Sequence, residues 1–197
     1  MTDPVDDIRR MTVAICAGVG IAFGVLQAGF VETWPALPAV DPDARVLWLG
    51  DSLVRRMPAI DQNLGVDGYQ TRHVLQQIDG LEGSQAEVVV LMLGVGDLIA
   101  GRGPEATASS VGQIVAELAE VVPSAAVVVV GILPAPRRVP ERLRRETNAL
   151  LAELDVVYVE PPAELEVVGD GLHLTTAGYR ELWTVIDPVL ATLTGLR

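Results

Sequence analysis

The sequence predicts a three-layer, doubly wound α/β domain with a mostly parallel sheet of about five strands, preceded by one N-terminal transmembrane helix. Three observations support this: apolar runs that suit buried strands, helical patterns that alternate with them, and an uncharged apolar stretch near the N-terminus. With 197 residues, half of them apolar, the chain can bury one such core. A second catalytic domain does not fit.

The uncharged stretch covers residues 11–31, and Arg9 and Arg10 precede it directly. A run of about 20 residues is long enough to cross a bilayer as a helix. By the positive-inside rule, residues 1–10 stay in the cytoplasm and the rest of the chain is exported. We therefore expect a single-pass membrane protein with a periplasmic or extracellular domain.

Two other interpretations of residues 11–31 are less favoured. A cleavable signal peptide usually has a shorter apolar core, and Leu26-Gln27-Ala28 is a poor cleavage site. A buried helix of a soluble domain would be weakened by the four glycines of the stretch, which membranes tolerate better. Cys16, the only cysteine, would lie in the membrane, so the domain is expected to need no disulfide.

Residues 32–45 contain Pro35, Pro38 and Pro42 together with acidic residues. This composition favours an extended spacer between membrane and domain. The domain is then expected to span residues 46–197.

Apolar runs and helical patterns alternate through that domain. The expected strands lie at about residues 46–49, 88–93, 126–132 and 156–159. The expected helices lie at about residues 70–79, 107–121, 140–152 and 176–193, the last interrupted at Pro188. Such alternation places a ligand site beyond the carboxyl ends of the strands.

The first apolar run ends in Gly50-Asp51-Ser52, which would lift a serine hydroxyl off a strand tip. A serine attacks well only when a neighbouring base removes its proton, so a histidine is required. The chain offers His73 and His173. His73 falls within a helical pattern and is predicted to be structural or solvent-facing.

His173 belongs to the turn Asp170-Gly171-Leu172-His173, which places an aspartate and a histidine on one loop. With the Gly-Asp-Ser run, this turn resembles the SGNH/GDSL hydrolase family over roughly residues 45–193. The resemblance implies a flavodoxin-like fold in which Ser52 and His173 are catalytic and Asp170 orients the histidine.

The resemblance also implies an oxyanion hole, with backbone N–H groups of Ser52 and Gly68 as donors. At the third donor position, where the family has an asparagine, this chain has Gly96. Losing such a donor typically slows turnover about 100- to 1000-fold. Three explanations stay open: the remaining N–H groups suffice with Gly96 a weak contributor, another side chain such as Asn63 or Gln70 substitutes, or catalysis has been lost.

Only ten residues separate Ser52 from Asn63, so little room remains for a helix and a second strand. That strand is expected to be vestigial. No cluster of metal-ligand residues has convincing spacing, so neither a metal nor a cofactor is expected.

Charge excludes some functions. The formal net charge is −12 and all fourteen cations are arginine. General affinity for nucleic acid is therefore not expected, and Schiff-base chemistry is excluded because lysine is absent.

Five arginines gather after the expected strand at 126–132 and could attract an anionic substrate or lipid headgroup. A solvated helix face with i,i+4 ion pairs, Glu141 with Arg145 and Arg142 with Glu146, is the favoured interpretation. The five are Arg137, Arg138, Arg142, Arg144 and Arg145.

Together these features predict a membrane-anchored serine esterase or acyltransferase acting on an acyl ester of a cell-envelope glycan or lipid, with a membrane protein as a further candidate partner. The alternative is a catalytically weak or inactive module that binds a partner in an envelope complex. Substrate, acyl chain length and the choice between hydrolase and transferase do not follow from the sequence.

Overall fold

The computed structural model describes residues 34–195, so the predicted transmembrane segment, residues 11–31, lies outside the described part. Across residues 34–195, none of the helices combines the length and the apolar character needed to cross a bilayer. The chain from Pro35 onward forms one compact unit.

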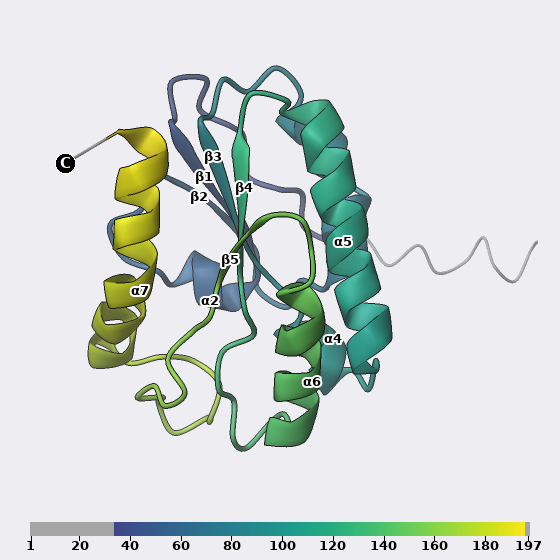
Figure 1. The fold of residues 1–197 in the computed structure, drawn as a ribbon, viewed down its shortest axis with the longest axis vertical. Helices are drawn as coiled ribbons and strands as arrows, with labels where there is room; N and C mark the ends of the chain where they lie inside the picture. Colours follow the sequence, from purple (N-terminus) through teal and green to yellow (C-terminus); the bar gives the residue numbers. More distant parts are fainter. Residues whose placement is uncertain (1–33, 196–197) are drawn as a thin grey trace, which may run out of the picture. The chain divides into compact units, whose positions relative to one another are not determined.

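This unit is built on a five-stranded parallel sheet with the strand order β2-β1-β3-β4-β5 (Figure 1). The strands are β1 (Val46–Gly50), β2 (Gln62–Gly65), β3 (Val88–Met92), β4 (Ala126–Val130) and β5 (Val157–Val159). Every residue of β1 and of β3 is buried, which agrees with their continuous apolar sequences. The predicted parallel α/β sheet is confirmed.

Helices cover both faces of the sheet. They are α2 (Ser52–Arg55), α3 (Thr71–Leu75), the 3₁₀ helix η1 (Ile78–Leu81), α4 (Val95–Ile99), α5 (Pro104–Val121), α6 (Glu141–Leu151) and α7 (Thr176–Thr194). Figure 1 shows α2 and α7 on one side of the sheet and α4, α5 and α6 on the other. This is the three-layer arrangement expected from the sequence.

The connection between β1 and β2 differs from the prediction. The second strand is not vestigial, because β2 pairs in register with β1 from Leu47 opposite Gln62 to Gly50 opposite Gly65. The element that is reduced is the connecting helix, since α2 makes a single turn. One turn suffices to reverse the chain, so the ten residues between Ser52 and Asn63 still reach the sheet edge.

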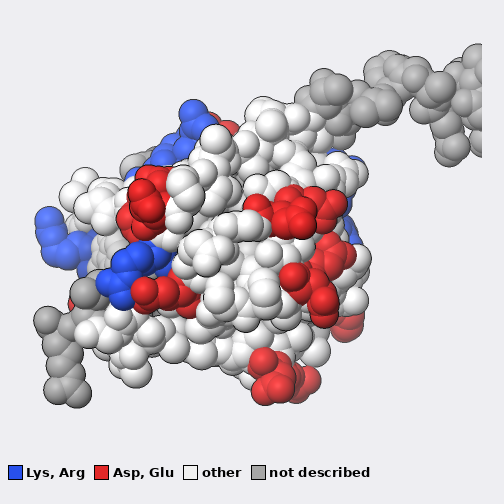
Figure 2. Space-filling view, turned by 90° about the horizontal axis from the view of Figure 1, so that it is seen from above, with Lys and Arg blue, Asp and Glu red and all other residues white. Residues whose placement is uncertain are grey.

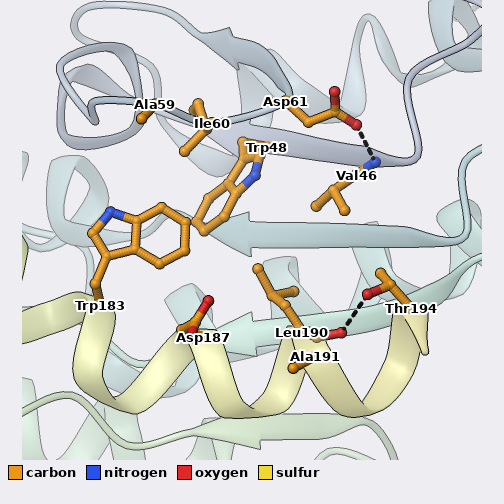
Figure 3. A pocket seen from close by; sticks show the side chains of 10 residues that line it. All are labelled: Val46, Trp48, Ala59, Ile60, Asp61, Trp183, Asp187, Leu190, Ala191 and Thr194. Carbon is orange, nitrogen blue, oxygen red and sulfur yellow. Dashed lines mark hydrogen bonds between the residues drawn. The ribbon is translucent and has the colours of Figure 1, made fainter. Parts of the chain in front are cut away.

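The short α2 leaves part of one face of the sheet uncovered. A groove of about 420 Å³ lies between α7, β1 and the β1–β2 connection (Figure 3). Its apolar wall includes Trp48 and Trp183, whose rings meet edge to face with centroids 5.2 Å apart. Ile60 and Leu190 complete this wall. The groove does not include Ser52, so it is separate from the predicted site.

The helix predicted at residues 70–79 is divided into α3 and η1. Val74 and Ile78 face inward as expected, whereas Leu75 is half-buried. His73 is buried, with 1% of its surface exposed, so its solvent-facing alternative is wrong and it is a structural residue.

The predicted interruption of the last helix is also wrong, because α7 continues through Pro188 to Thr194. Proline removes one backbone donor, whose acceptor would be the carbonyl of Thr184 four residues earlier. Thr184 and Pro188 are both exposed, so water can satisfy that carbonyl. The buried Leu182 and Ile186 keep this part of the helix on the sheet.

The proline-rich segment at residues 35–45 contacts the domain along its length. The Tyr69 hydroxyl donates to the carbonyl of Pro35, and the N–H of Asp41 donates to Gln62 Oε1 over 3.1 Å. The compact unit therefore begins earlier than residue 46.

The charged side chains at the end of the unit where α7 terminates are mostly acidic, and they are scattered over a largely uncharged surface (Figure 2). Figure 2 shows them in several separate groups, with arginines mostly toward the margin of that view. This agrees with the net charge of −12 and disfavours the approach of anions to this end.

Candidate active site

Ser52 stands where β1 turns sharply into α2. The turn needs glycine at position 50, because a Cβ there would lie 2.2 Å from the carbonyl oxygen of Met92 on the neighbouring strand. Asp51 caps α2, since its Oδ1 accepts the N–H of Leu53 over 2.8 Å. The hydroxyl of Ser52 is thereby held at the carboxyl end of the sheet, as the sequence predicted.

The structure brings Ser52, His173 and Asp170 into one hydrogen-bonded chain. Ser52 Oγ lies 2.8 Å from His173 Nε2, and His173 Nδ1 lies 2.6 Å from Asp170 Oδ2. With a proton on Nδ1 donated to the aspartate, Nε2 is free to accept the serine proton. These distances suit transfer of a proton from serine to histidine.

Asp170 is fixed by its own loop. Its Oδ1 accepts the backbone N–H groups of Leu172 and His173 over 2.9 and 3.0 Å. The hydrogen bond from the His173 ring, followed by these two N–H groups, holds the pKa of Asp170 far below its usual value. Asp170 is therefore an anion at neutral pH, suited to stabilise a positively charged imidazole.

Two members of the arginine cluster hold this loop. Arg137 Nη1 donates to the carbonyl of Gly169 over 2.8 Å, and Arg138 Nε donates to the carbonyl of Asp170 over 3.1 Å. Gly171 has φ +71°, and a Cβ there would lie 2.6 Å from Arg137 Cβ. These contacts were not predicted, although the position of the cluster after a strand end was a signal that it lies near the site.

The rest of the cluster behaves as expected on α6, with one exception. Arg142 pairs with Glu146 and Arg145 pairs with Glu141, at 2.6 and 2.9 Å. Arg144 is buried instead of solvated. The i,i+4 pattern predicts the surface pairs but does not distinguish a buried member.

Next to Ser52 is a pocket of about 230 Å³ that also includes Gly68 and Gly96. All three predicted oxyanion residues are therefore brought together. Gly68 has φ +77°, a left-handed conformation that favours glycine. Gly96 offers no side-chain donor to this pocket.

The two candidate substitutes for the missing asparagine are placed differently. Asn63 Nδ2 donates to the carbonyl groups of Val54 and Arg55 over 2.9 and 3.2 Å, and Asn63 does not line the pocket. Gln70 does line it. Of the two candidates, Gln70 therefore lies in the pocket beside Ser52 and Asn63 does not.

Asp97, the residue after Gly96, holds the two sides of the pocket together. It is fully buried and accepts the N–H and the hydroxyl of Thr71 over 2.9 and 2.7 Å. Arg102 Nη1 also donates to it over 2.9 Å. No local pattern predicts this network, because its members are separated along the chain.

Among residues 34–195, no group of histidine, cysteine and acidic side chains is arranged to hold a metal ion.

A parallel α/β sheet whose strand ends carry this array is typical of esterase-like hydrolases. The chain belongs to the GDSL-like lipase/acylhydrolase family, whose model matches residues 15–181. The resemblance to the SGNH/GDSL hydrolases is thus confirmed, and with it a hydrolase of the esterase type.

Individual relatives agree with this assignment. The chain is 27% identical over 182 residues to the bovine (Bos taurus) platelet-activating factor acetylhydrolase IB subunit alpha1, covering 78% of each. The Talaromyces cellulolyticus family 3 carbohydrate esterase superposes with a TM-score of 0.65 at 18% identity, over 77% of this chain and 98% of that one. The Clostridium thermocellum family 3 carbohydrate esterase superposes with a TM-score of 0.60 at 17% identity, over 76% of this chain and 98% of that one. At these identities the solved structures show a shared fold.

Proposed function

We propose that this protein cleaves or transfers an acyl ester through Ser52, His173 and Asp170, while a segment at residues 11–31 anchors it in a membrane. The observation that carries the catalytic part is the chain of hydrogen bonds from Ser52 Oγ through His173 to Asp170, at 2.8 and 2.6 Å.

The reaction begins when Ser52 Oγ attacks the ester carbonyl and His173 Nε2 takes its proton. Asp170 stabilises the resulting imidazolium, and backbone N–H groups of Ser52 and Gly68 stabilise the oxyanion. His173 then gives the proton to the departing alkoxide, which leaves an acyl group on Ser52. Water, or an acceptor hydroxyl, then attacks the acyl carbonyl while His173 takes its proton. The bond to Ser52 Oγ breaks, His173 returns the proton to Ser52, and the acid or the new ester is released.

A short acyl group on an envelope glycan or lipid is the substrate class that we favour. The pocket beside Ser52 is small, at about 230 Å³, and Ile99 and Leu172 form part of its apolar lining. The relatives described as an acetylhydrolase and as carbohydrate esterases support short acyl groups and glycans respectively. A series of p-nitrophenyl esters should therefore show turnover that falls as the acyl chain lengthens.

The first test is covalent labelling of the full-length protein with a fluorophosphonate, followed by intact mass. One adduct is expected on the wild type and on Ser109→Ala, which changes an exposed serine, and none on Ser52→Ala or His173→Ala. A folded wild type that takes no adduct would instead favour the binding module, the alternative that the missing asparagine at position 96 suggests.

The anchor is tested separately. Full-length protein should stay with the membrane fraction after carbonate extraction, whereas a chain starting at residue 34 should be released. Release of both would refute the anchor without affecting the catalytic proposal.

A further inference from the structure

The pocket beside Ser52 contains a side chain that can compensate for the glycine at position 96. We propose that the side-chain amide of Gln70 donates a hydrogen bond to the oxyanion. The inference rests on the proposed function and adds one catalytic residue to it.

Gln70 has a free donor in the right pocket. It lines the same 230 Å³ space as Ser52, Gly68 and Gly96. Within residues 34–195 its side-chain NH₂ group has no hydrogen-bond acceptor, so the donor is available to a ligand. The other polar side chains of this pocket, apart from the Ser52 hydroxyl, are engaged elsewhere: the carboxyl group of Asp51 is buried and caps α2 through the N–H of Leu53, and the Tyr69 hydroxyl donates to Pro35.

Gln70 and Gly96 are spatially complementary. A Cβ built on Gly96 would lie 3.4 Å from Gln70 Cγ and 2.8 Å from the carbonyl oxygen of Tyr69. The side chain of Gln70 therefore occupies space next to position 96, and the glycine permits its close approach. An asparagine at 96 would displace this loop, so the chain accommodates one amide side chain or the other.

The backbone around Gln70 is rigidly held, as an oxyanion donor requires. Its N–H donates to Nδ1 of the buried His73 over 2.9 Å, and its carbonyl accepts the N–H of His73 over 3.0 Å. The next N–H, of Thr71, donates to the buried Asp97. The buried His73 thus fixes the backbone of Gln70.

The test compares Gln70→Ala and Gln70→Glu with Gln76→Ala, a change to an exposed glutamine on the same segment. Loss of an oxyanion donor should lower kcat about 10- to 1000-fold and leave KM within about twofold. An alkyl boronic acid forms a tetrahedral anion on an active serine, so its inhibition constant should rise with the loss of kcat. Gln70→Glu retains the size of the side chain, so it should fold even where Gln70→Ala does not. Gln76→Ala should match the wild type.

Two failures are distinguishable. If the wild type reacts with a fluorophosphonate at Ser52 and hydrolyses esters, but both Gln70 variants keep kcat and boronic acid affinity within about twofold, only the role of Gln70 is overturned. If the wild type neither reacts nor hydrolyses esters, the proposed function is overturned along with it.

Discussion

The carboxyl group of Asp51, the residue before Ser52, is buried in surroundings that disfavour its charged form. Only 3% of the residue is exposed, and its Oδ2 has no hydrogen-bond partner in the part of the chain that the structure describes. Burial, aided by the charges of Asp97 and Asp67, raises its pKa to about 7, although the N–H of Leu53 opposes this. At neutral pH Asp51 is close to the midpoint of its titration.

Replacing Asp51 with asparagine should therefore stabilise the protein at alkaline pH. The folded-state pKa of about 7 exceeds the ordinary 3.8, so the wild type loses stability as pH rises between those values. We expect Asp51→Asn to raise the free energy of unfolding by on the order of 2–4 kcal/mol at pH 8 and by little at pH 4. Asparagine keeps the cap of α2 and does not ionise. Urea unfolding across this pH range measures the difference.

Asp79→Asn is the control, because that carboxylate is exposed and is not among the charges that shift the pKa of Asp51. This substitution should change the free energy of unfolding by less than about 0.5 kcal/mol at every pH. A gain for Asp51→Asn that did not change with pH would contradict this account of its ionisation.

At the scale of single elements, α6 contains three arginine–glutamate pairs, and those of Arg144 and Arg142 differ most in burial. The side chain of Arg144 is 4% exposed, bonds Glu141 at 2.7 Å and donates to the carbonyl of Ile132 over 3.1 Å. The side chain of Arg142 is 73% exposed and bonds Glu146 alone among residues 34–195. Burial should make their contributions to stability unequal.

We expect Arg144→Ala to lower the free energy of unfolding by about 2 kcal/mol, through lost hydrogen bonds and packing. Arg142→Ala should lower it by less than about 0.5 kcal/mol. Arg144 holds the pKa of Glu141 at about 2 instead of 4.5, so its pairing is present above pH 4.5 and is lost as pH falls toward 2. Denaturant unfolding at pH 7 and pH 3 checks both points, and equal losses at pH 7 would refute the distinction.

The accuracy of the sequence-based prediction varied with the element. β1, β3 and β4 were predicted because strands of a parallel sheet are buried on both faces and consist of apolar runs. The Ser52, Asp170 and His173 positions followed from local motifs. The contacts of Arg137 with Gly169 depend on tertiary packing, which no local pattern encodes. The length of α2 and the continuation of α7 through Pro188 were likewise decided by packing against the sheet.

At the scale of the whole molecule, α7 joins the end of the chain to its first strand–helix turn. The hydroxyl of Tyr179 on α7 donates to the carbonyl of Leu53 on α2 over 2.7 Å, in a buried position. Burial raises the pKa of Tyr179 to about 12, so this hydroxyl keeps its proton at neutral pH. Along the same face, Trp183 of α7 meets Trp48 of β1.

Tyr179→Phe should destabilise the protein by about 1–2 kcal/mol, because the carbonyl of Leu53 would be left buried without a donor. Tyr158→Phe is a matched control, since the Tyr158 hydroxyl bonds the exposed Glu160 and its loss should cost less than about 0.5 kcal/mol. The shift in urea midpoint reports both values. Equal shifts for the two variants would show that the Tyr179 bond does not connect α7 to α2 energetically.

Ser52 follows the first strand of the sheet, whereas His173 precedes the last helix, 121 residues later. The other four strands of the described sheet lie between these two residues in the sequence. A nascent chain that ends after β5 contains every strand of the described sheet. It still lacks His173, the partner of Ser52, and the helix α7 that follows it. Activity would thus appear only after His173 and α7 are made, and a nascent chain that stops before them would stay inert.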